Sequence, residues 1–182
     1  MAKKGLEYVC YGMLQEDGTY KNGKYVGPTA KFQATATTNS VKDYGDNGVV
    51  ATDTSVTNGT VSLEINEMVN QHHASLLGHT YDTETDEVRC NRNDIAPYVG
   101  IGCLGMSTGA KPFKVVVYLK AQFKEPSDEY DTMQETVTFN HSTLEGDFYT
   151  LENGDYSIKK GFDTKQQAKD YLNKLLGIAT EE

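Results

Sequence analysis

With 182 residues, a formal net charge of −9 and a pI near 4.9, the chain has the length of a single domain and an acidic surface. Such a surface repels nucleic-acid backbones and anionic membranes, so a nucleic-acid-binding or membrane-surface protein is disfavoured. No apolar run approaches the roughly 18 residues of a membrane span, the N-terminal MAKKGLEYV lacks an apolar signal core, and the 3 cysteines are too few for a disulfide framework. We therefore expect folding in a reducing cell interior.

The first third of the chain has the patterns of antiparallel strands. Apolar residues predict a strand over Tyr8–Leu14, and Asn22-Gly23 predicts a tight turn within a hairpin over Thr19–Val26. Strict alternation predicts a strand over Lys31–Thr37, with Phe32, Ala34 and Ala36 on its inner face. The outer face carries Lys31, Gln33, Thr35 and Thr37.

A long polar loop over Val41–Ser55 separates this strand from the next. Loops of this length in small domains are usually functional or disordered. Its centre buries too little surface to order itself, so we expect mobility in the isolated chain and order on contact with a neighbour. A second alternating strand starts at Asn58-Gly59, with Val61, Leu63 and Ile65 facing in and Thr60, Ser62, Glu64 and Asn66 facing out.

A short helix follows directly, with Asn66 as its predicted N-cap and Gly78 as its stop. Further strands are predicted over Tyr98–Met106, Phe113–Phe123 and Met133–Asn140, and a last hairpin over Phe148–Ile158 around Asn153-Gly154. On the most hydrophobic strand, one side is expected to carry Val115, Val117, Leu119, Ala121 and Phe123.

The chain closes with a strong amphipathic helix. Asp163 is its predicted N-cap and Gly177 its end, and its apolar face carries Ala168, Tyr171, Leu172, Leu175 and Leu176. We expect one domain over residues 1–177 and a loose tail over 178–182. The predicted fold is mainly β: a β-sandwich or distorted barrel with a short central helix and a C-terminal helix.

The histidines form the first candidate for chemistry. His72, His73 and His79 cluster in the sequence, but adjacent histidines point to different helix faces and no carboxylate lies at a recognised ligand spacing. We interpret them as solvated helix-surface residues and assign no metal site.

Other candidate motifs have plain structural interpretations. Cys90 and Cys103 lack a zinc-knuckle spacing, and the GIGCLG run lacks the Lys-Ser/Thr of a phosphate loop, so its glycines are interpreted as those of a bent strand. The acidic run of Asp82, Glu84, Asp86 and Glu87 lacks the central glycine of a calcium loop. We assign no catalytic or cofactor-binding residue and predict that the protein is not an enzyme.

The polar strand faces permit two interpretations. Small hydrophilic residues line the outer sides of Lys31–Thr37, Thr60–Asn66 and the segment Gln134, Thr136, Thr138 and Asn140. One interpretation is the ordinary solvent face of a sandwich. The other is the wall of a water-filled tube.

Several segments, in the same order along the chain, resemble the major tail protein of long-tailed, non-contractile phages, the subunit of the tail tube. They are GLEYVCYGMLQEDGTY, KDYGDNG, NGTVSLEINEM, LLGHTYD, APYVGIGCLG and FKEPSDEYDTMQETVTFNHSTLEG. Asn47 stands where a second acidic residue is common in the family, and we expect no immunoglobulin-like module after the last helix.

The resemblance implies a structural subunit of hexameric rings that stack into a tube conducting DNA during ejection. Implied partners are copies of itself, the tape measure protein and the tail terminator and baseplate proteins, with DNA passing without specific binding and no membrane contact. The implied location is the virion tail, after folding and assembly in the host bacterial cytoplasm. The ring-stacking loop would comprise Asp43, Tyr44, Gly45, Asp46, Asn47 and Gly48. The lumen would be lined by Gln33, Thr35, Glu64, Thr136 and Thr138.

Two alternatives stay open at this point. One is the related tube of a phage-like bacteriocin or a type VI-like secretion apparatus, which shares the fold but not the DNA cargo. The other is a small β-sandwich module that binds glycan or peptide, which exposed aromatic residues clustered on one face would favour.

Overall fold

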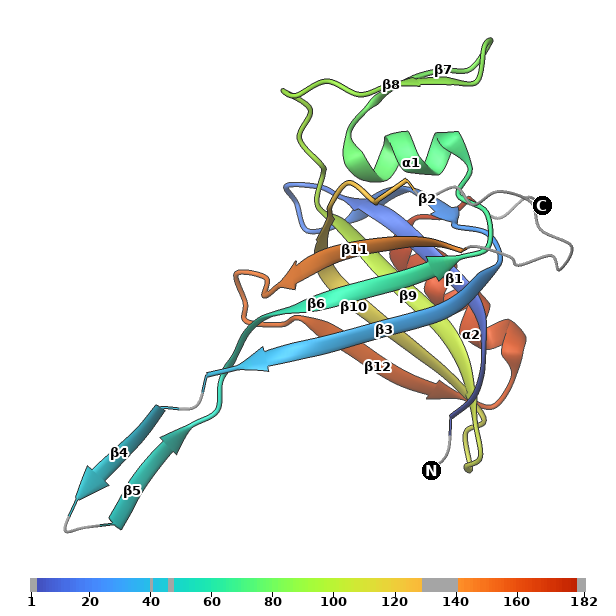
Figure 1. The fold of residues 1–182 in the computed structure, drawn as a ribbon. Coiled ribbons are helices and arrows are strands. Elements are labelled where there is room, and N and C mark those ends of the chain that lie inside the picture. Colours follow the sequence, from blue (N-terminus) through green and yellow to red (C-terminus); the bar gives the residue numbers. More distant parts are fainter. Residues whose placement is uncertain (1–2, 40, 46–47, 129–140, 180–182) are drawn as a thin grey trace, which may run out of the picture.

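Twelve strands and two helices make up the described part of the chain (Figure 1). The computed structural model describes residues 3–39, 41–45, 48–128 and 141–179, with the backbone alone at Lys3 and over 41–45 and 48–53. In chain order the elements are β1 (Lys3–Leu14), β2 (Tyr20–Tyr25), β3 (Thr29–Thr38), β4 (Val41–Gly45), β5 (Gly48–Asp53), β6 (Val56–Ile65), α1 (Asn70–Leu77), β7 (Thr80–Asp82), β8 (Glu87–Arg89), β9 (Val99–Ser107), β10 (Phe113–Phe123), β11 (Ser142–Tyr149), β12 (Ser157–Phe162) and α2 (Lys165–Leu176).

One antiparallel sheet of 8 strands forms the body, with the order β2-β1-β9-β10-β11-β6-β3 and β12 paired to β10. The sheet folds over a core to which β1, β9 and β10 contribute from one layer and β6 and β11 from the other; among its buried residues are Val9, Tyr11, Val61, Leu63, Ile101 and Phe148. The predicted mainly β architecture is therefore confirmed.

Helix α2 covers the outer side of β1, β9 and β10 (Figure 1). Its buried residues Ala168, Leu172 and Leu176 pack there with residues such as Cys10 and Leu104. A side chain at Gly102 would meet Leu172, so the glycine run that superficially resembles a phosphate loop leaves space for this helix.

Strand β10 changes partners along its length. It pairs with β12 over Phe113–Tyr118 and with β11 over Ala121–Phe123, and its register with β9 shifts between Tyr118 and Ala121. The irregularity reverses which side chains face the central core. The predicted single apolar side is therefore divided: Val115, Val117 and Leu119 pack under α2, whereas Ala121 and Phe123 face the central core.

Both predicted Asn-Gly hairpins differ from the structure. Asn22 has a positive φ of 53°, but it lies inside β2, beside a register shift in the β1–β2 ladder, and forms a bulge rather than a turn. The second segment does turn at Gly154, with a φ of 85°. Its strands β11 and β12 then diverge, because each pairs with a different part of β10.

The helix starts and the tail also differ from prediction. Helix α1 begins four positions after Asn66, with Val69 as an N-cap that makes no side-chain cap hydrogen bond. Helix α2 is capped by Thr164, whose side chain accepts from the amide of Gln167, and not by Asp163. Both glycine stops are confirmed, in left-handed conformations. The expected loose tail begins with an ordered residue, since Ile178 bridges to Gly23 and packs under α2.

Candidate functional site

Three neighbouring strands present one continuous polar face. The register places Gln33 opposite Ser62 and Thr35 opposite Thr60, and Glu145 opposite Ser62 from the other side. Successive side chains of a strand alternate between faces, and the intervening residues Val61, Leu63 and Leu144 are buried. The face therefore comprises Lys31, Gln33 and Thr35 of β3, Thr60, Ser62 and Glu64 of β6, and Thr143, Glu145 and Asp147 of β11.

Two ion pairs cross this face. Lys31 Nζ lies 2.9 Å from Glu64 Oε1, and Lys124 Nζ lies 2.7 Å from Asp147 Oδ2. Glu145 has no ion-pair partner among the described residues. The two lysines and three carboxylates around the shallow groove on this face leave one net negative charge, and Glu145 carries it.

Of the predicted lumen residues, Gln33, Thr35 and Glu64 come together on this face. Thr136 and Thr138, together with the predicted strand Met133–Asn140, lie outside the described residues. The sequence reasoning missed the contribution of β11. Its residues 142–149 alternate as clearly as those of β6, and this alternation was the available signal.

The predicted long loop is instead a hairpin. Strands β4 and β5 pair from Val41–Asp53 to Gly45–Gly48, with a register shift between Asp43 and Tyr44. Of the predicted stacking residues, Asp43, Tyr44 and Gly45 lie on β4 and Gly48 begins β5, while Asp46 and Asn47 lie outside the described residues. Figure 1 shows the hairpin extending well beyond the body, where β3 and β6 leave it.

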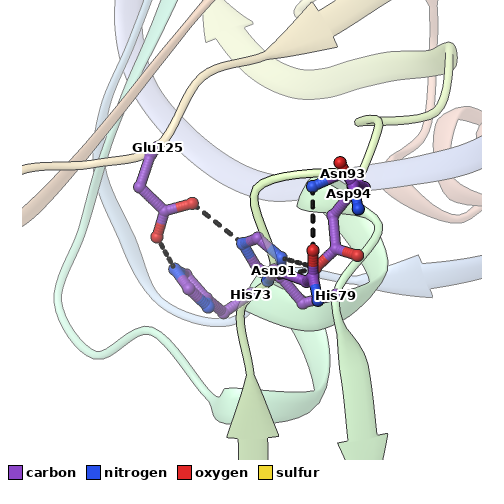
Figure 2. A network of polar contacts seen from close by, with 6 residues as sticks. All are labelled: His73, His79, Asn91, Asn93, Asp94 and Glu125. Carbon is purple, nitrogen blue, oxygen red and sulfur yellow. Dashed lines mark hydrogen bonds and ion pairs between the residues drawn. The ribbon is translucent and has the colours of Figure 1, made fainter.

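A second cluster lies at the other end of β6, where the chain enters α1 (Figure 1). His73 Nε2 is 3.2 Å from Glu125 Oε1, and His79 Nε2 is 2.8 Å from Glu125 Oε2. Figure 2 shows the Glu125 carboxylate beside both imidazole rings, with one oxygen directed at each ring. His79 Nδ1 is in turn 2.8 Å from Asp94 Oδ2, which also accepts from the amide of Asn91.

The histidines were therefore wrongly interpreted as solvated. The side chain of His79 is only 8% exposed, and His72 is half-buried with its Nδ1 3.0 Å from the hydroxyl of Tyr11. Burial acts to lower the pKa of His79, but hydrogen bonds and charge attraction from Asp94 and Glu125 outweigh it and raise that pKa. The two nitrogens of His79 can both donate to these carboxylates only when the ring is protonated.

Local backbone contacts position this cluster. Gly78 ends α1 with a φ of 77°, and its bare Cα allows the carbonyl of Ile95 to approach, which places the Asp94 segment beside His79. Gln122 Nε2 donates to the carbonyl of Ala96 at 2.7 Å and ties the same segment to the end of β10. The sequence did not reveal Glu125, because 46 positions separate it from His79.

Comparison with known proteins identifies the family. A model described as phage tail tube protein matches residues 1–101, which is more than half of the 182 residues. A comparison with curated protein sequences finds no match.

Within the described ranges, neither helix is long and apolar enough to cross a membrane. The matched residues include β1 to β8 and the start of β9, and thus the hairpin and two of the three strands of the polar face. The chain belongs to the phage tail tube protein family, whose members are structural proteins that self-assemble into the tube of the virion tail.

Proposed function

We propose that this chain forms hexameric rings that stack into the phage tail tube, and that the polar face of β3, β6 and β11 lines the channel through which DNA leaves the virion. The observation that carries the proposal is the unbroken polar character of that face over three paired strands. A wall of hydroxyl, amide and mostly paired charged groups offers phosphates few cations to hold.

The free edge of β3 supports ring closure. Strand β3 ends the sheet and extends over Thr29–Thr38, so one row of its backbone groups has no strand partner in the described chain. Long exposed edges promote pairing with another chain, and closing a ring of subunits removes them. A neighbouring subunit that pairs along β3 would continue the polar face around the channel.

The two ends of β6 support stacking. The β4–β5 hairpin precedes Val56, and α1 with β7 and β8 follows Ile65, so different structures occupy opposite ends of the polar face (Figure 1). A contact between two different surfaces propagates a filament. The hairpin of one ring would then dock on the α1 end of the next.

The function inferred here is structural and involves no catalysis. Assembly would occur in the host bacterial cytoplasm, with the tape measure protein inside the growing tube and terminator and baseplate proteins at its ends. DNA would pass without specific binding.

Electron microscopy of the purified protein tests the proposal. The intact chain should form tubes with a central channel, and a cryo-EM map should place Gln33 and Ser62 on the channel wall. Deletion of residues 43–47 should leave a folded chain that no longer forms tubes. A tube with this face on its outside would overturn the assignment, as would normal tube formation by the deletion variant.

Hydrogen exchange on the same samples tests the ordering of the hairpin. Amides over residues 41–55 should be slow only in tubes. Equal protection in the isolated subunit and the tube would contradict ordering on stacking.

A tube for a phage-like bacteriocin or a secretion apparatus is the second candidate, and the DNA cargo alone separates it from the first. The glycan- or peptide-binding module has less support. Among the described residues, the exposed large aromatic side chains are Tyr25 and Tyr98, at 40% and 42%, and each packs against a different ring, Tyr25 on Tyr8 and Tyr98 on Tyr149.

A further inference from the structure

We propose that His73, His79 and Glu125 bind a divalent transition metal ion such as Zn²⁺ at the α1 end of the subunit. Their ligand atoms, one from each residue, lie within 4.8 Å of one another. Two imidazole nitrogens and a carboxylate oxygen form a donor set that zinc accepts.

The geometry needs little rearrangement to accommodate the ion. Zinc lies about 2.0–2.2 Å from nitrogen and oxygen ligands, so neighbouring ligands of a tetrahedral ion stand roughly 3.4 Å apart. The Glu125 oxygens are 3.2 Å and 2.8 Å from the two histidine nitrogens, so a modest spreading of the side chains would place the ion among them.

The surroundings of the cluster resemble those of a metal site rather than a chance surface contact. Metal-bound histidines commonly donate their second nitrogen to a carboxylate, which fixes the ring. Asp94 occupies this position for His79, and it is itself held by the amide of Asn91 at 2.8 Å. Figure 2 shows this chain of contacts from Asn91 through Asp94 to His79.

The cluster also has an open side. The Glu125 side chain is 55% exposed, whereas that of His79 is 8% exposed, so an ion would enter past the carboxylate and keep a position for water. Lys124 and Glu125 point to opposite sides of the extended chain, Lys124 toward Asp147 on the polar face and Glu125 toward α1. The ion would thus join the end of β10 to α1, away from the proposed channel wall.

Titration of the metal-free full-length protein tests the site. Calorimetry with Zn²⁺ should give one ion per chain, and Co²⁺ should produce the intense visible absorption of a four-coordinate ion. His79→Gln and Glu125→Gln should weaken Zn²⁺ binding at least about 100-fold, and Asp94→Asn about 10- to 100-fold. His141→Gln is the matched control, because His141 is exposed and lies outside the cluster.

His73→Gln provides a second ligand variant if loss of the buried His79 ring prevents folding. Binding of equal strength in wild type, His73→Gln and Glu125→Gln would overturn the site, as would absence of binding in the folded wild type. Metal binding is measured on the isolated subunit, so absence of metal binding would leave the proposed tube function standing. Absence of tubes would contradict the proposed tube function, but it would not change the result of the metal titration.

Discussion

Two glycines with similar backbone angles have different surroundings. Gly78 and Gly154 have φ values of 77° and 85°, a region that side chains with a Cβ rarely adopt. A Cβ at Gly154 would meet nothing within 4 Å, whereas one at Gly78 would overlap the carbonyl of Ile95. The conformational requirement is shared, but only Gly78 holds two segments together.

Gly78→Ala should therefore cost much more stability than Gly154→Ala. The left-handed conformation alone costs about 1–2 kcal/mol for alanine, and the overlap with Ile95 should bring the loss at Gly78 to about 3 kcal/mol or more. Chemical denaturation followed by circular dichroism measures both values. Equal losses would mean that the Ile95 segment moves away without cost.

The three cysteines should differ in reactivity. Cys10 and Cys103 are buried, and burial raises the pKa of the Cys10 thiol, whereas Cys90 is exposed. Local desolvation and the nearby carboxylates of Glu125 and Asp94 nevertheless raise the pKa of Cys90, so this thiol should react steadily rather than very fast. Thiol titration should show one group in the folded chain and 3 after unfolding. Cys90→Ser should abolish the reaction in the folded chain. Any thiol that still reacts in that variant would contradict the burial of Cys10 and Cys103.

At the scale of single elements, sequence patterns predicted the strands and helices better than their ends or partners. Alternation identified β3, β6 and β10, because burial of one face selects the residue type at every second position. The pairing partners of a strand cannot be predicted in this way. Nothing in the sequence of β10 shows that its two halves pair with different strands. The apolar residues on both sides of the 118–121 irregularity hid the change of face.

The cap of α2 gives a direct comparison between the predicted and the observed residue. Thr164→Ala should cost about 1 kcal/mol, because its side chain accepts from the amide of Gln167. Asp163→Ala should cost about 0.5 kcal/mol or less, as for an exposed position outside the cap. Urea titrations of the two variants measure both losses of unfolding free energy. A larger loss for Asp163→Ala would favour the residue predicted from the sequence.

At the scale of the whole molecule, the polar face and the histidine cluster differed in how far the sequence revealed them. Gln33, Thr35 and Glu64 were predicted to line the lumen together, because they alternate with core residues on strands that the family resemblance places there, and the structure brings them to one face. Glu145 was missed as the source of net charge, because only the structure pairs Glu64 with Lys31. The contact of Glu125 with His73 and His79 depends on tertiary packing, which no short spacing encodes.

Charge reversal on the proposed channel wall should hinder DNA passage. Glu145→Lys would turn a net negative face into a positive one, so the wall would hold phosphates with a log–log salt slope of about −0.9 for each new contact. Folding should be affected by no more than about 0.5 kcal/mol. Phage carrying this variant should assemble tails but eject DNA slowly, most strongly at low salt.

Two further substitutions complete this experiment. Glu64→Lys should act in the same direction, and it also places a second lysine beside Lys31, so tubes should form less well. Glu152→Lys, in the exposed turn after β11, is the control and should leave ejection unchanged. Normal infectivity of both wall variants would place the channel elsewhere.

The divided pairing of β10 has a mechanical consequence. In a stacked tube, any load along the tube would pass through each subunit and would tend to slide its two layers past one another. Because one continuous strand is hydrogen-bonded to β12 in the α2-covered layer and to β11 in the polar layer, shear between the layers must break backbone ladders rather than slide side chains over one another. The fork at β10 should thus make the body of each subunit resist shear between its two layers.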